Sequence, residues 1–137
     1  MVRSLHDNFL VGYEVESEAR EIRLHTEWRD QGEPFERTTV LFSGVEAYDF
    51  RDDCLGNIIF ALTEVPPESI ITPRLAEIQE RNRISGWPRF WRDSQDEALN
   101  YLKAQATRGF EFSSSYGMTG WVLAREIQMF DEHGAIV

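Results

Sequence analysis

Cysteine, lysine and long apolar runs are nearly absent from the sequence, and each absence excludes a class of protein. Cys54 is the only cysteine among 137 residues, so the chain forms neither an internal disulfide nor a zinc site built from several cysteines. Lys103 is the only lysine, and arginine therefore carries nearly all of the positive charge. No apolar run approaches the roughly 18 residues of a membrane-spanning helix, and residues 1–7 lack the apolar segment of a signal peptide. We therefore expect a cytoplasmic protein with no membrane partner.

Positive charge as a whole is scarce. The sequence has 14 basic side chains and 24 carboxylates, which gives a formal net charge of −10. A chain of this charge repels phosphate backbones, so we expect no nucleic-acid partner. Residues 1–65 hold 14 acidic residues against 6 basic ones, so most of the excess lies in the first half. A partner steered by charge should be a basic protein that meets this half of the chain.

The short motifs that identify common enzyme classes are missing too. The chain has no Gly-x-Ser-x-Gly element of a serine hydrolase and no Gly-x-x-x-x-Gly-Lys phosphate-binding loop. His6, His25 and His133 each lack a second histidine or cysteine three or four residues away, which is the spacing of a helical metal site. We expect no catalytic residues, no metal ion and no cofactor, and we favour a protein that is not an enzyme.

Two segments keep an enzyme open as the alternative. Asp7 follows His6 and is placed to orient its imidazole in an acid–base pair, although a polar cap before the first strand is the simpler explanation. Asp49, Asp52 and Asp53 crowd a turn, where they suit either a divalent cation or the ordinary preference of turns for aspartate. A small metal-dependent or acid–base enzyme would require His6, Asp7 and the Asp49–Asp53 cluster to meet in space.

Apolar and polar residues alternate with a period of two through the first half, which is typical of strands. We predict five strands, over residues 9–15, 22–28, 36–43, 45–50 and 57–65. The best-defined pair is a hairpin closed by Glu16 and Glu21, which places Glu14 opposite Arg23. The inward face of its first strand is expected to carry Phe9, Val11, Tyr13 and Val15, with Phe9 beside Trp28.

Helical signals follow in the middle of the chain. Thr72 suits the N-cap of a short helix over residues 73–83, because proline follows it at the first helical position. Ser94 begins a capping box for a second helix over residues 94–108, and Gly109 stands where a helix C-terminus favours glycine.

A glycine-bracketed turn then predicts a closing hairpin whose second strand spans residues 121–130. The pattern as a whole indicates a single α+β domain over residues 1–137. We expect an antiparallel sheet of about seven strands, with one or two helices inserted before the C-terminal hairpin.

Two surfaces are candidates for binding a partner. The first is acidic and includes Glu14, Glu16 and Glu18 on the first hairpin, where the alternative is an ordinary solvated face. The second is the aromatic segment, residues 87–92, in which Trp87, Arg89 and Trp91 are residue types that dominate interface hot spots.

The alternative for the aromatic segment is that its side chains close the core between helices. The preceding helix offers little more than Leu75 and Ile78, so we expect at least one tryptophan to stay partly exposed, within cation–π range of Arg89 or Arg92. Such a patch would suit a partner groove or a homodimer interface.

Three short motifs carry a resemblance to a known group of proteins. They are Leu5-His6-Asp7 before the first hairpin, Phe42-Ser43-Gly44-Val45, and Gly56-Asn57-Ile58-Ile59. Together they resemble small uncharacterised bacterial proteins that open with Leu-His-Asp, some of which are similar to immunity proteins of polymorphic toxin systems. The resemblance implies a mostly β domain without known enzymatic activity, and it supplies no catalytic residues. The leading hypothesis is therefore an immunity-like binding protein that presents an acidic face to a basic protein.

Overall fold

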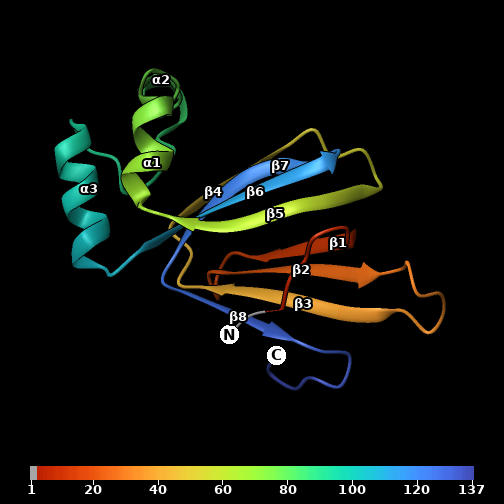
Figure 1. Cartoon of the computed structure of the whole chain (residues 1–137). Helices are drawn as coiled ribbons and strands as arrows, with labels where there is room; N and C mark the ends of the chain where they lie inside the picture. Colours follow the sequence, from red (N-terminus) through yellow and green to blue (C-terminus); the bar gives the residue numbers. More distant parts are fainter. Residues whose placement is uncertain (1–2) are drawn as a thin grey trace.

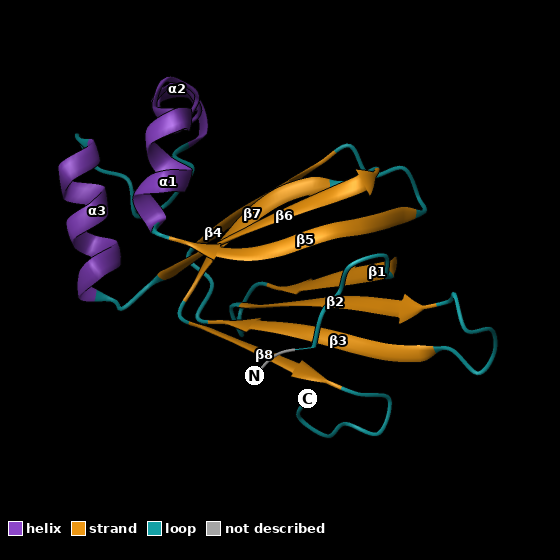
Figure 2. Ribbon diagram, in the orientation of Figure 1, coloured by secondary structure: helices purple, strands orange, loops and turns teal. Residues whose placement is uncertain are grey.

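The computed structural model describes residues 3–137, and in this range it contains eight strands in one sheet, together with short helices (Figures 1 and 2). The fold is of the α+β class, as predicted. The elements in chain order are β1 (Phe9–Glu16), β2 (Glu21–Trp28), β3 (Glu36–Ser43), β4 (Ala47–Arg51), β5 (Asn57–Val65), α1 (Pro67–Ile71), the 3-10 turn η1 (Thr72–Arg74), α2 (Leu75–Ser85), α3 (Gln95–Ala104), β6 (Arg108–Tyr116), β7 (Thr119–Ala124) and β8 (Glu126–Phe130). None of the helices in this range is long and apolar enough to cross a membrane.

The sheet consists of two four-stranded halves that share one short joint. The strand order is β4-β7-β6-β5-β1-β2-β3-β8, and neighbouring strands pair antiparallel. At the joint, β1 pairs with β5 only through Phe9 with Ile58 and Leu10 with Asn57. Figure 1 shows the halves as two groups, with β5, β6, β7 and β4 above β1, β2, β3 and β8.

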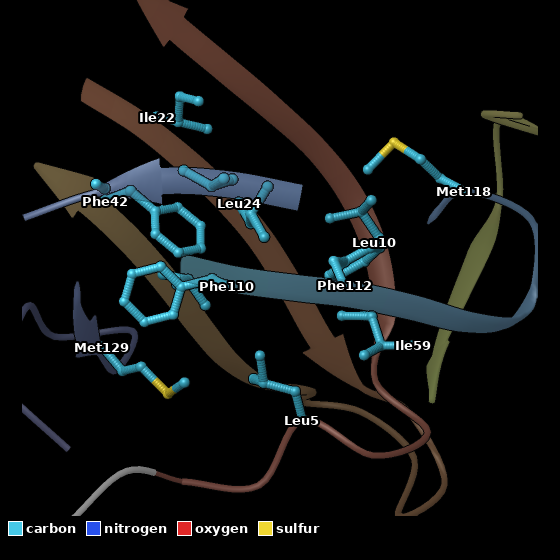
Figure 3. Packing of buried hydrophobic residues seen from close by; sticks show 13 residues of the cluster. Leu5, Leu10, Ile22, Leu24, Phe42, Ile59, Phe110, Phe112, Met118 and Met129 are labelled. Carbon is cyan, nitrogen blue, oxygen red and sulfur yellow. The ribbon is translucent and has the colours of Figure 1, made fainter. Parts of the chain in front are cut away.

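The main core lies between these two halves. Its residues come from both, and the rings of Phe42 in β3 and Phe110 in β6 approach to 5.3 Å between centroids. Figure 3 shows these two rings next to each other, with Ile22 and Leu24 from one half and Phe112 and Ile59 from the other. Burial of this apolar area is the main force that holds the halves together.

The helices pack against one end of the opposite face of the β4-β7-β6 group. Val122 and Ala124 of β7 point into the main core, whereas Trp121 and Leu123 point into a second core with α1, α2 and α3. Ser94 caps α3 as predicted, because its hydroxyl accepts a hydrogen bond from the Glu97 amide at 3.2 Å. The second core places the segment between α2 and α3 against the sheet.

The hairpin register is correct near its turn and wrong at its far end. Glu16 pairs with Glu21 and Glu14 with Arg23, as predicted. An irregularity between Leu10 and Gly12 shifts the rest, so Phe9 lies opposite Glu27 rather than Trp28. As a result, the Leu10 side chain is buried in the core and the Val11 side chain is exposed. The prediction that Val11 lies on the inward face is therefore wrong.

Three other predictions are corrected by the structure. The strand expected over residues 121–130 is two strands, because at Arg125 the chain crosses from β4-β7-β6-β5 to the other half of the sheet. Thr72 is not an N-cap, because it continues the helical backbone from α1. Gly109 does not end a helix but lies in β6, where a side chain would meet the Val65 carbonyl oxygen at 2.7 Å.

Candidate partner-binding site

A cavity of about 570 Å³ lies where four segments of the chain meet, and we name it the corner cleft. These segments are the turn of the β1–β2 hairpin, the connection from β3 to β4, the aromatic segment and α3. Aromatic surface comes from Tyr48, Trp87, Phe90 and Tyr101, and charge comes from residues that include Glu16 and Arg89. The cleft therefore has the mixture of aromatic and charged side chains that favours binding of a partner.

Glu46 joins three of these segments. Its side chain is only 4% exposed and pairs with the Arg20 guanidinium in the hairpin turn at 2.6 Å. The Tyr101 hydroxyl of α3 donates to the same carboxylate at 3.2 Å. A buried carboxylate is stable only when it is paired, so Glu46 fixes the hairpin turn and α3 relative to the connection before β4.

The aromatic segment divides between the second core and the corner cleft. Phe90 and Trp91 are buried in the second core, so Trp91 is not available to a partner. Trp87 is partly exposed, as predicted for at least one tryptophan, and it lines the cleft. Its cation–π partner is Arg81 of α2, 3.7 Å from the ring centroid, rather than Arg89 or Arg92 as expected.

The two arginines of the aromatic segment are exposed. Arg89 and Arg92 line the corner cleft, and within residues 3–137 neither forms an ion pair. Trp91 was a candidate partner-binding residue, because the helix before it offers only a thin apolar stripe. It is buried instead in the second core, which includes residues of α1, α3 and β7, and of these only α3 lies near Trp91 in sequence.

The three predicted carboxylates of the hairpin are all exposed. Glu14 pairs with His25 at 2.8 Å, and Glu16 lies 3.7 Å from Arg23, which is closer to Glu21 at 3.2 Å. Arg23 therefore stands opposite Glu14 in the register but pairs with other carboxylates. Glu16 alone of these three lines the corner cleft, so the structure brings it to the same cavity as Trp87 and Arg89.

A second feature lies beside the acidic hairpin and has no local signal in the sequence. It is the open edge of β1, which we define as Val11–Glu16. Within residues 3–137 the pairing of β1 with β5 stops at Leu10, so beyond it one side of β1 has no neighbouring strand. Val11 is 53% exposed, Tyr13 38% and Val15 40%, so three large apolar side chains of this edge are open to solvent. A second cavity of about 510 Å³ separates Leu10–Tyr13 from the turn over residues 53–57.

The residues of the enzyme alternative have separate partners in the structure. His6 pairs with Asp7 at 3.2 Å, and both are exposed. Asp49 pairs with Arg51 at 2.9 Å and with Arg81 at 3.0 Å, which uses its carboxylate for ion pairing between β4 and α2. Within residues 3–137 no three histidine, cysteine, aspartate or glutamate side chains are placed to hold a metal ion.

Asp53 has a structural role in the turn before β5. Its carboxylate accepts hydrogen bonds from the Asn57 amide at 2.9 Å and from the Leu55 backbone at 2.8 Å. These two bonds lower the pKa of Asp53 below its ordinary value, because they favour the ionised form. Asp53 therefore binds Asn57 within its own turn, whereas Asp49 pairs with Arg81 of α2. The two carboxylates do not share a partner.

The fold and the site together define an α+β protein with a charged, aromatic-lined cleft next to an exposed strand edge. No family model, no curated protein and no solved structure matches the chain.

Proposed function

We propose that this is a binding protein, not an enzyme, and that it presents the acidic hairpin and the corner cleft to a basic protein partner. The observation that carries the proposal is the position of Glu16, Trp87 and Arg89 around one cavity. These residues come from the acidic hairpin and from the aromatic segment, which are about 70 residues apart in the chain. Their convergence supports a single continuous binding surface.

Two physical contributions would act on this surface. The exposed carboxylates Glu14, Glu16 and Glu18, in a chain of net charge −10, attract a basic partner and raise its rate of association. The aromatic walls of the corner cleft offer apolar area for an anchoring side chain of the partner, as in interface hot spots. Charge therefore selects the partner, and the cleft supplies the anchor.

An immunity-like role fits the same features. A toxin that acts on nucleic acid carries a basic cleft, and an acidic protein occupies such a cleft by presenting charges like those of the nucleic acid. The motifs around Leu5, Phe42 and Gly56 support this version of the proposal through the resemblance described above.

The test compares two triple variants of equal charge. Glu14→Gln/Glu16→Gln/Glu18→Gln removes the acidic hairpin, and Glu33→Gln/Glu68→Gln/Glu132→Gln removes three exposed carboxylates elsewhere. Binding is measured, at low and high salt, to each basic protein encoded beside the gene.

For a true partner, the hairpin variant should lose about tenfold in affinity, since three exposed charges contribute about 0.5 kcal/mol each. Its salt dependence should weaken as well, whereas the control variant should bind like the parent. Equal losses in the two variants, or no binding to any protein of the panel, would contradict the proposed function.

A further inference from the structure

The open edge of β1 has the unpaired backbone of an edge strand. Beyond Leu10, no strand in residues 3–137 pairs with β1 on the side away from β2. Alternate backbone N–H and C=O groups of an edge strand are directed outward, where they are available to another chain. The open edge therefore offers a row of donors and acceptors of the spacing that an extended segment requires.

Two cavities flank this edge and leave space for such a segment. One lies along Leu10–Tyr13 and is bounded on its far side by the turn over residues 53–57. The other is the corner cleft, which begins at Val15 and Glu16. Between the two cavities, Tyr13 packs edge-to-face on Phe50 of β4 at 5.3 Å between ring centroids.

We infer that the basic partner contributes an extended segment that adds to the open edge of β1 as a further strand. This inference rests on the proposed function and specifies how the partner is recognised. Main-chain hydrogen bonds would provide affinity, and alternating side-chain contacts would provide specificity, as in other cases of strand addition.

The side chains along the edge define the chemistry of the segment. Beyond the irregularity at Val11, Tyr13 and Val15 alternate with Glu14 and Glu16, so one face of β1 is apolar and the other is acidic. Cross-strand pairing favours apolar residues opposite apolar ones and opposite charges across from each other. The complementary segment therefore alternates apolar residues with lysine or arginine.

The other charged groups around the edge favour the same occupant. Asp53 lines the cavity along Leu10–Tyr13, so a carboxylate also stands on its far side. On β2, Arg23 is already paired with Glu21 at 3.2 Å, and His25 is paired with Glu14 at 2.8 Å. Glu16 lies farther from Arg23, at 3.7 Å, so of the two β1 carboxylates it is the more available to a cation of the partner.

A second copy of the chain is a poorer occupant of this edge. Pairing two β1 strands would bring together two acidic faces, each with Glu14 and Glu16, in molecules that each carry a net charge of −10. Like charges across paired strands are destabilising. Charge complementarity therefore selects a basic segment over self-association.

The probe for the experiment is an eight-residue peptide of alternating lysine and valine, blocked at both ends. Two further peptides carry N-methyl groups on the lysine amides or on the valine amides. One of these sets faces β1 in a paired strand and the other faces away. Affinity is measured by isothermal titration at low salt, with a glutamate–valine peptide as the charge control.

Strand addition predicts that the parent peptide binds, that methylation of one set weakens binding at least tenfold, and that methylation of the other changes it less than twofold. The glutamate–valine peptide should not bind. Equal affinity of both methylated peptides, or no binding of the parent peptide, overturns the inference. A dimer in sedimentation that must dissociate before the peptide binds overturns it as well, because the edge then belongs to a second copy.

A matched pair of protein variants locates the peptide. Val11→Arg places a repelling charge on the open edge, and Ile84→Arg places the same charge on the exposed face of α2, where Ile84 is 69% exposed. The first should weaken peptide binding at least tenfold and the second less than twofold. Equal effects overturn the location on β1. The triple variants described under the proposed function test separately whether binding depends on charge. Binding that is insensitive to N-methylation but lost in the acidic-hairpin variant would refute strand addition and leave the proposed function standing.

Discussion

The ion pair between Glu46 and Arg20 is the contact whose loss should most affect the shape of the corner cleft. Removing one member of a fully buried pair costs about 3–5 kcal/mol, whereas an exposed pair contributes about 1 kcal/mol or less. Glu46 has a side chain 4% exposed and Arg20 one 45% exposed, so this pair lies between the two limits. We expect Glu46→Gln and Arg20→Met each to reduce the free energy of unfolding by about 2 kcal/mol.

A double-mutant cycle measures this coupling directly. The double variant should lose about 2.5 kcal/mol rather than the sum of both single losses, which gives a coupling energy of about 1.5 kcal/mol. Each single variant should lower the midpoint of thermal unfolding by about 8 °C. Urea unfolding of the four proteins provides the free energies. Single losses that add to within about 0.3 kcal/mol would refute the argument that Glu46 joins the hairpin turn to the cleft.

Three further predictions concern the rest of the fold. Asn57→Ala should lower the free energy of unfolding by about 3 kcal/mol in urea, because its side-chain oxygen accepts from the backbone amides of two turns at 2.8 and 3.0 Å. Gly120→Ala should lower the free energy of unfolding by about 2 kcal/mol or more in the same assay, since its added Cβ would lie 2.3 Å from a backbone carbonyl oxygen. In the control Gly12→Ala, the added Cβ meets nothing within 4 Å, and the loss should be under about 0.5 kcal/mol. A hydrogen bond from Arg108 lowers the pKa of Glu64, so the stability that this pair contributes above the ordinary pKa of 4.5 is lost as the pH falls. Glu64→Gln should therefore flatten the acid side of the profile of stability against pH. An unchanged profile would contradict the assignment.

The parts of the fold that local signals determine were predictable from the sequence. The strands β3 and β5 have the predicted bounds, because polar or glycine-containing segments flank a short β-branched or apolar run. The cap of α3 at Ser94 was also predictable, since its signal lies within four residues. Local chemistry is sufficient for such elements.

The errors concern contacts between residues that are distant in sequence. The apolar positions keep a period of two on both sides of Arg125, so this one charged residue in the apolar phase was the local sign that β7 and β8 join different halves of the sheet. The Arg125 amide donates to the Ser43 carbonyl at 3.0 Å, a contact that only the assembled fold produces. The irregularity after Leu10 likewise depends on the neighbours of β1 and not on the hairpin turn.

The candidate site shows the same division. Glu16 and Trp87 were predicted separately from composition, but their meeting at one cavity depends on the packing of the second core. Glu46 was missed because its hydrogen-bond partners Arg20 and Tyr101 lie 26 and 55 residues away. The open edge of β1 was missed because an unpaired side of a strand is defined by the pairing of the whole sheet.

Amide hydrogen exchange along β1, with and without the lysine–valine peptide, tests the central claim most directly. In the free protein, exchange from Val11 to Glu16 should alternate, with amides directed toward β2 protected and those on the open edge exchanging fast. Saturating peptide should protect the fast amides and leave the exchange of α2 unchanged. Fast amides that stay unprotected while the peptide is bound would contradict the account, because the peptide would then be held by charge without joining the sheet.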